Sequence, residues 1–393
     1  MTFGTFARGG KVVNQSEEVL CMRQRAGVDS VRFVAVAVAC GVLILSWAMK
    51  RAAAQEDKPV EQTRKNIQVL KGLPDSQLFM VMNFMRASLG VSCAFCHVNS
   101  GGDKWEWEKD DKRQKQTARR MIQMVLDINK NNFGGMNRVT CYTCHRGNEH
   151  TVPAPPLPQT APEGGPAGEA KPAPARPTAD QLIEKYWQAL GGRAAIEKAK
   201  TRVMKGTQVS SGNGSSMPFE IAQAAPDKFA VTLTTPQAVM ERGYNGTTGW
   251  MKGPRGQREL MGADLEQMKR NADFFWMLKL KELSKEMSVT GPEQVGERDA
   301  YVLRVRLTPH HTERYFFDTQ TGLLLRIITL EDTLIGAIPE QTDFEDYRVV
   351  GGVKLPYTVR QSYVDPWIGW TRKFTEIKLG APVDEKKFDP PAK

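Results

Sequence analysis

Two five-residue segments constrain this 393-residue chain more than any other feature: CAFCH at residues 93–97 and CYTCH at residues 141–145. In each, two cysteines lie three positions apart and a histidine follows the second. This is the pattern of c-type haem attachment, where two thiols bond the vinyl groups and the adjacent imidazole binds the iron. A zinc site gains nothing from a histidine fixed at that position. We therefore expect two covalently bound haems c, held by Cys93, Cys96, Cys141 and Cys144, with His97 and His145 as proximal ligands.

Near the start of the chain, residues 33–49 form an unbroken apolar run, FVAVAVACGVLILSWAM. Arginines precede it, and Lys50, Arg51 and three alanines follow it, as in a secretory leader cleaved after Ala54. A retained anchor is the alternative, because 17 apolar residues are at the short end of a membrane span. Met22 offers a second start codon. Both alternatives place the protein in the bacterial periplasm or cell envelope, and a retained leader would anchor it in the inner membrane.

A proline-rich segment divides the rest of the chain. Residues 151–178 contain nine of the 23 prolines, and proline neither continues a helix nor donates to a sheet. We predict a linker there. The predicted organisation is a leader (1–54), a dihaem domain (55–150), the linker (151–178) and a second domain (179–393).

The predicted dihaem domain has helical periodicity and no strand pattern. After Pro74, apolar residues recur every three or four positions up to Gly90, just before the first motif. Residues 116–131 repeat the arrangement before the second motif. We therefore predict an all-α domain in which an amphipathic helix with methionines precedes each motif. The apolar faces are Leu78, Met82, Met85 and Leu89 in the first helix, and Met121, Met124, Val125 and Ile128 in the second.

The second domain is predicted to be mainly antiparallel β with one or two packed helices. Thr178 and Gln181 form a capping box for a helix over 182–190, and a short helix is expected over 263–272. Alternation with period two then indicates strands, separated by glycine turns. The clearest alternating runs are 301–307, 314–317, 323–328 and 357–363.

The second axial ligand of each haem follows partly from counting histidines. Of the five, two are proximal and two, His310 and His311, belong to the other domain, where we interpret them as solvated in a loop. Only His150 is left, so bis-histidine ligation of both haems is excluded. At least one iron is therefore left with a methionine or an open site. Periodicity alone allows Met82 or Met85 for the first helix, and Met121 or Met124 for the second.

Residues 66–147 resemble the cytochrome c subunit of bacterial photosynthetic reaction centres, most specifically in ARRMIQMVLDIN and CYTCHRG. The resemblance implies Met82 as axial ligand for the haem on Cys93, Cys96 and His97, and Met121 for the haem on Cys141, Cys144 and His145. Met85 and Met124 are the reserves. It also implies that Arg146 pairs with a haem propionate.

The chain also departs from that family. The family subunit carries four haems, and it has no counterpart of residues 179–393. The C-terminal segments YNGTTGWMKG and DYRVVGGVKLPYTVRQ resemble the periplasmic lipoprotein-carrier half barrels, which implies an antiparallel sheet curled over helices. We expect a dihaem carrier that shares the family's building block, and not a photosynthetic subunit.

Three functions are therefore open. The favoured one is a periplasmic electron carrier, not an enzyme, with two His/Met haems that exchange electrons with membrane or periplasmic donor and acceptor proteins. A dihaem peroxidase-like enzyme would need one open iron. In the third, the C-terminal domain binds a lipid or other hydrophobic ligand and the haems are accessory. The net charge of +10 is spread without a basic run, so no nucleic-acid partner is expected.

Overall fold

The computed structural model describes residues 57–102, 104–151, 176–254, 256–282 and 286–391. The predicted leader and most of the predicted linker (152–175) lie outside the described residues. The chain divides into two compact units, Met1–Glu56 and Asp57–Lys393, and every described residue belongs to the second. Within the described ranges, no helix combines the length and the apolar character that a membrane span requires.

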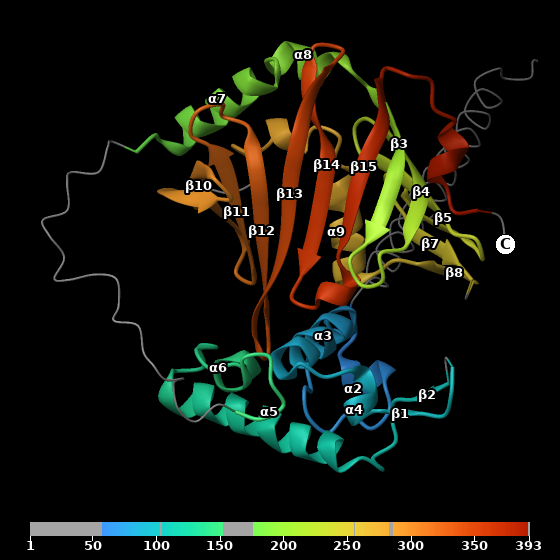
Figure 1. The fold of residues 1–393 in the computed structure, drawn as a ribbon, viewed down its shortest axis with the longest axis vertical. Coiled ribbons are helices and arrows are strands. Elements are labelled where there is room, and N and C mark those ends of the chain that lie inside the picture. The colour runs from blue at the N-terminus through green and yellow to red at the C-terminus, as the bar shows by residue number, and fades with distance from the viewer. Residues whose placement is uncertain (1–56, 103, 152–175, 255, 283–285, 392–393) are drawn as a thin grey trace, which may run out of the picture. The chain divides into compact units, whose positions relative to one another are not determined.

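The helical part, residues 57–151, contains both predicted amphipathic helices (Figure 1). The first of these helices ends where the sequence predicted, because Gly90 takes the left-handed conformation (φ 66°) that favours glycine. Each motif forms one short helical turn directly after its long helix and loop. The elements are α2 (Val60–Thr63), η2 (Asp75–Gln77), α3 (Leu78–Leu89), α4 (Cys93–Cys96), α5 (Arg113–Asn132) and α6 (Cys141–His145).

The prediction of an all-α domain is wrong at one place. Strands β1 (Val98–Asn99) and β2 (Trp105–Glu106) pair as a small antiparallel hairpin after the first motif. Gly101 and Gly102 make its turn with positive φ angles of 111° and 56°. Two-residue strands are too short to produce a visible alternation, so periodicity could not reveal them.

The β-rich part, residues 176–391, is built on a 13-stranded antiparallel sheet among the described residues. Its order is β8-β7-β6-β5-β4-β3-β15-β14-β13-β12-β11-β10-β9, so each paired couple consists of sequence neighbours except β3 with β15, while the sequence neighbours β8 and β9 form the two edges. The strands are β3 (Thr201–Ser210), β4 (Ser216–Ala224), β5 (Lys228–Thr234), β6 (Val239–Tyr244), β7 (Gly249–Gly253), β8 (Gly256–Glu259), β9 (Met287–Val295), β10 (Arg298–Thr308), β11 (His311–Asp318), β12 (Leu324–Thr333), β13 (Gly336–Val350), β14 (Val353–Tyr363) and β15 (Trp370–Leu379). All four predicted alternating runs fall on these strands.

Helices cover one face of this sheet, which we call the inner face. The predicted helix α7 (Ala179–Leu190) has its capping box, since Thr178 and Gln181 bond reciprocally at 2.9 and 3.2 Å. It packs on β10, β11 and β14, and α9 (Gly262–Ala272) packs on β4 to β6. Met204 and Phe374 contact both clusters, so the two helices share one face. The smaller helices are α8 (Arg193–Lys198), η3 (Trp276–Leu278), η4 (Pro366–Ile368) and η5 (Glu385–Phe388).

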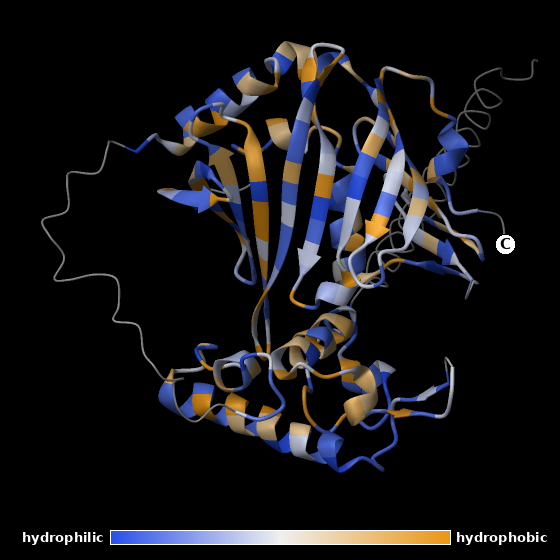
Figure 2. Ribbon diagram, in the orientation of Figure 1, coloured by the Kyte–Doolittle hydropathy of each residue, from blue (hydrophilic) through white to orange (hydrophobic). Residues whose placement is uncertain are grey.

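Hydrophobic and hydrophilic residues alternate along the strands, as Figure 2 shows for the sheet facing the viewer. Because successive strand residues point to opposite faces, this alternation separates the apolar inner face from the solvated one. The predicted fold class is therefore confirmed in outline: a small helical region followed by a large antiparallel β domain.

The helical and β-rich parts share a core. Ile335 and Ile338, at the start of β13, are each 1% exposed and lie in one apolar cluster with Val81 and Phe84 of α3 and Ile122 of α5. Arg86 of α3 makes an ion pair with buried Asp365, which precedes η4. Residues separated by more than 200 positions thus bury one another.

Candidate haem-binding site

Each motif presents its two thiols from a single helical turn. Residues three apart on a helix lie on the same face, so Cys93 and Cys96 on α4, and Cys141 and Cys144 on α6, form two neighbouring pairs. None of these cysteines is in a disulfide. The arrangement suits two thioether bonds to one porphyrin edge.

The thiols lack the chemistry of a redox dithiol. Burial raises the pKa of Cys96 and also that of Cys141. Catalytic and disulfide-exchanging cysteines instead have lowered pKa values, because the thiolate is the nucleophile. This environment disfavours a disulfide oxidoreductase site.

His145 is held in an orientation suited to an iron ligand. Its Nδ1 lies 3.0 Å from the carbonyl oxygen of Asn148, to which it can donate. A backbone acceptor on one ring nitrogen fixes the tautomer and leaves Nε2 free for a metal, as in most histidine ligands.

His97 lies in an aromatic setting made by the β1–β2 segment. Trp107 meets its ring edge-on at 5.1 Å between centroids, and Trp105 stacks on Trp107 at 4.7 Å. Burial lowers the pKa of His97, and the nearby Lys115 lowers it further. Both favour the neutral imidazole, which is the form that binds iron. Sequence reasoning missed the two tryptophans, because the two-residue strands of this hairpin show no period in the sequence.

The two repeats interlock crosswise. Helix α3 packs against α6, and α4 packs against α5. The backbone N–H of Gly147, just after α6, donates to Ser88 O at 2.9 Å. At this crossing a Cβ on Gly90 would lie 2.2 Å from Gly147 O, so only glycine allows the approach. Each long helix therefore touches the motif helix of the other repeat.

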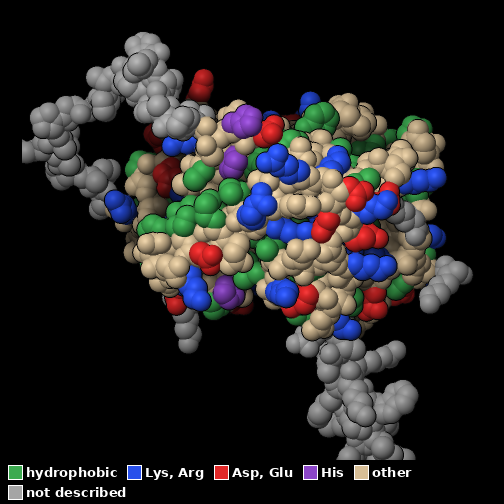
Figure 3. Space-filling model, turned by 90° about the horizontal axis from the view of Figure 1, so that it is seen from below, with side chains coloured by type: hydrophobic (Ala, Val, Ile, Leu, Met, Phe, Trp, Pro, Cys, Tyr) green, Lys and Arg blue, Asp and Glu red, His purple; other side chains and the backbone are tan. Residues whose placement is uncertain are grey.

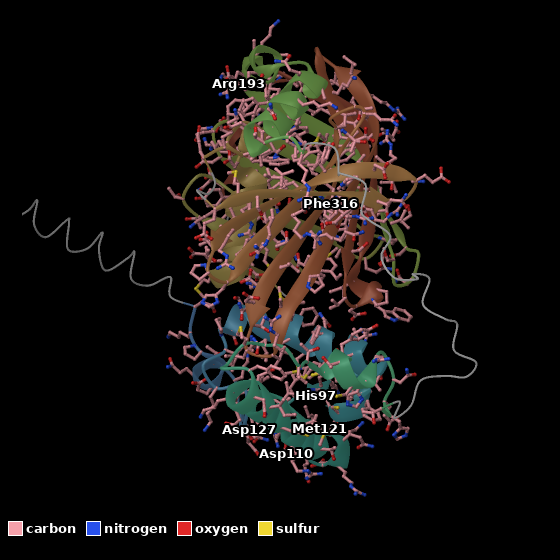
Figure 4. The ribbon with its side chains drawn as sticks, turned by 90° about the vertical axis from the view of Figure 1, so that its left-hand side faces the viewer. His97, Asp110, Met121, Asp127, Arg193 and Phe316 are labelled. Carbon is pink, nitrogen blue, oxygen red and sulfur yellow. The ribbon has the colours of Figure 1, made fainter. Side chains whose placement is uncertain are left out.

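The candidate axial methionines divide into two groups by burial. Met82 and Met85 are half-buried against the shared core. Met121 and Met124 are 39% and 42% exposed on α5; Figure 4 labels Met121 and His97 within the helical part. All four thioethers keep accessible surface, so both members of each pair stay candidates.

Exposed apolar side chains gather around the motifs. Soluble proteins rarely expose large apolar patches, and those that do usually bind something there. Figure 3 shows a band of hydrophobic side chains near histidines on this face. A flat apolar macrocycle would cover such a band, so the residues present fit haem. In the helical part the large exposed ones are Phe79, Trp107, Met121, Met124, Phe133, Met136 and Tyr142.

Arg146 ends α6 in the left-handed conformation, with φ 52°. Its side chain is exposed, and no ion pair to it is found among the described residues. The suggested pairing of Arg146 with a propionate stays a prediction.

The prediction for His311 was wrong. His310 is exposed in a turn, but His311 begins β11 and is buried between two carboxylates, with Nδ1 2.7 Å from Glu331 and Nε2 3.0 Å from Glu313. These bonds outweigh burial and raise its pKa to about 9. Tyr315 donates to Glu313, and Gln77 of the helical part donates to Glu331 at 3.2 Å. A histidine pair in a turn gives no local sign of partners on other strands.

The comparisons with known proteins agree with the motif region. Residues 44–163 match the family model of the photosynthetic reaction centre cytochrome C subunit. The reaction center cytochrome c subunit of Roseobacter denitrificans is 41% identical over 93 residues, and cytochrome c-554 of Chloroflexus aurantiacus is 35% identical over 88. These alignments cover 22% and 20% of this chain, and 24% and 20% of those proteins. The chain thus spans about a quarter or less of these relatives, and the resemblance is confirmed for this segment.

The β-rich part has its own similarities among solved structures. A DUF1329 family protein from Desulfovibrio piger aligns with a TM-score of 0.41 at 10% identity, over 53% of this chain and 96% of that one. A LolA superfamily protein from Nitrosomonas europaea aligns with a TM-score of 0.36 at 11% identity, over 55% and 98%. The chain therefore joins a segment similar to reaction centre cytochrome c subunits to a large antiparallel β domain.

Proposed function

We propose that the helical part binds two haems c and that the protein carries electrons in the bacterial periplasm or cell envelope. The observation that carries the proposal is the repeated C-x-x-C-H motif, each copy on a helical turn beside exposed apolar surface. The family match implies covalently bound haem c; the number of two rests on the two motifs.

In this proposal, thioether bonds form at Cys93 and Cys96 for the first haem, and at Cys141 and Cys144 for the second. His97 and His145 are the proximal ligands. Bound haem supplies one-electron exchange between ferrous and ferric iron. Methionine opposite histidine raises the reduction potential, and a ligand set that stays unchanged on electron transfer suits a carrier.

The crosswise packing supports ligation within each repeat. Helices in direct contact are separated by about 8–10 Å between axes, which leaves no room for a porphyrin with a side chain on each face. The contacts of α3 with α6 and of α4 with α5 therefore disfavour a haem at those crossings. The proposed pairs remain Met82 with His97, and Met121 with His145.

The donor and acceptor are proposed to be membrane or periplasmic redox proteins. This rests on the predicted leader and on the similarity to reaction centre subunits over residues 44–163. A photosynthetic role is not part of the proposal, because the two motifs and the large β domain depart from the family's pattern.

The test is a haem count on full-length protein matured in a periplasm. The alkaline pyridine spectrum should report two haems per chain. Cys93→Ala with Cys96→Ala should leave one, and so should Cys141→Ala with Cys144→Ala. Two haems retained after either change would refute the assignment.

The same preparations separate a carrier from an enzyme with an open iron. Reduced wild-type protein should bind carbon monoxide poorly, whereas Met82→Ala and Met121→Ala should each open one iron to it. Met85→Ala and Met124→Ala serve as matched controls one helical turn away. Ready binding by the wild type would instead favour the peroxidase-like alternative.

A further inference from the structure

The hairpin between β12 and β13 leaves the sheet and enters the helical part. Pairing of β11 with β12 ends at His311 and Glu331, and pairing of β13 with β14 begins at Glu340. Beyond these points β12 and β13 pair only with each other, as far as Thr333 and Gly336, and the Asp332 N–H donates to His310 O at 2.8 Å where the ribbon leaves the sheet. Figure 1 shows this narrow ribbon reaching down between α3 and α6.

The projecting tip is anchored by apolar burial. Ile335 and Ile338 are buried in the shared core, whereas Leu334 between strands is 38% exposed. Burial of these two side chains stabilises the contact, because it removes apolar surface from water. The tip is thus fixed to the helical part and does not merely touch it.

The tip also contacts the residue that precedes the second motif. A Cβ on Gly336 would lie 2.8 Å from Cγ2 of Thr140, and Gly336 itself has φ 129°. Beside it, the side-chain amide of Asn137 donates to Thr333 O at 2.9 Å. The Thr333 hydroxyl donates to Gly336 O at 2.8 Å and closes the tip.

Helix α6 needs such support. It has only five residues, and helices this short are unstable in isolation. From the other side, buried Asn129 of α5 accepts from the N–H groups of Arg138 and Val139 at 3.1 and 2.9 Å. Asn129 and the hairpin tip therefore both hold the segment that leads into Cys141.

We infer that the β12–β13 tip is a positioning element for the second haem motif: it holds Thr140, and through it α6 and His145, in place. This inference rests on the proposed function. The tip touches the approach to the second motif and, among the described contacts, none to α4. Ile335 and Ile338 of the same tip also pack in the core against which Met82 lies, but Gly336 contacts Thr140, so a change at Gly336 reaches the second site directly.

The test uses steric compensation in full-length haem-loaded protein. Gly336→Ala adds a methyl group against Thr140 Cγ2. Thr140→Ser removes that methyl while keeping the hydroxyl, so the double variant restores the space. Each is made in the Cys93→Ala/Cys96→Ala and the Cys141→Ala/Cys144→Ala backgrounds, which isolate the second and the first haem.

Gly336→Ala should shift the midpoint potential of the second haem and increase its carbon monoxide binding, with the first haem unchanged. Thr140→Ser in addition should move both readouts back toward the wild type, because it removes the clash and leaves only the strain of alanine at a φ of 129°. Leu334→Ala, at the exposed tip position, is the control and should change neither haem.

Equal changes in both haems, or no change in the second, would overturn the inference. Failure of the Thr140→Ser rescue would overturn it as well. Absence of haem from the wild type would count against the proposed function and is seen independently in the pyridine spectrum.

Discussion

At the scale of single residues, the least expected feature is His311, a buried cation between two carboxylates. Three carboxylates face it: Glu313 on β11, Glu331 on β12 and Glu340 on β13. The like positive charge of Arg270 on α9 lowers the pKa of His311. Burial raises the pKa of Glu340. The cluster links the β-rich part to Gln77, directly before α3.

This cluster should make the stability of the fold depend on pH. The folded pKa of His311, about 9, lies above its ordinary value of 6.5. The stabilisation of the fold by protonated His311 is therefore complete below pH 6.5 and is lost as the pH rises through about 9. A shift of this size corresponds to roughly 3 kcal/mol. His311→Gln should lower stability by that order near neutral pH and flatten the pH dependence.

Urea unfolding across this pH range, followed by the β signal in circular dichroism, measures the effect. His310→Gln is the matched control, because that neighbour is exposed. If both variants lose stability equally, or if wild-type stability is flat up to about pH 9, the buried ion pairs do not have this role.

At the scale of elements, the long helices were predictable and the links between them were not. Methionine and leucine spacing revealed α3 and α5, and Gly90 marked an end, because these signals are local. The crossing at Gly90 and Gly147 joins residues 57 positions apart, and β1–β2 is too short for periodicity. The cysteines and histidines of the site were readable from spacing, whereas Trp107 and Asn129 act through contacts that leave no sequence pattern.

The crossing itself predicts an asymmetric effect of two glycine substitutions. Gly90→Ala meets Gly147 O in addition to a positive φ of 66°. Gly134→Ala has a similar φ of 60° and nothing within 4 Å. The conformational cost alone is about 1–2 kcal/mol, so Gly134→Ala should lose about that much.

Gly90→Ala should lose clearly more stability and should loosen α3 from α6. Thermal unfolding followed in the haem absorption band compares the two variants directly. Equal losses would mean that the two backbones can separate freely, and that the crossing does not hold the repeats together.

At the scale of the molecule, sequence patterns distinguished a helical segment from a β-rich one but gave no hint of their shared core. Ile335 and Ile338 were ordinary strand residues in the sequence. Their partners, Val81 and Phe84, are more than 250 positions away. Burial between distant segments has no local periodicity, so only the structure reveals it.

The shared core predicts the result of cutting the proline-rich segment 152–175. The two fragments should remain associated under native conditions, because the isoleucine cluster and the Arg86–Asp365 ion pair do not depend on that connection. Size-exclusion chromatography after mild proteolysis should show one coloured peak containing both fragments. Ile335→Asp should release them, while Leu334→Asp should not. Separate elution of the wild-type fragments would contradict this.

The pairing of β3 with β15 has a consequence for the order of folding. Strands β3 to β8 form one run of sequence neighbours, and β9 to β15 form another. Trp370 pairs with Ser210, 160 positions earlier, and this seam alone joins the two runs. Each run closes short loops and can collapse early, whereas the seam must wait until the last strand of the chain has been synthesised. Both cysteine motifs precede the two runs in the sequence, so they are complete while the sheet is still in two halves.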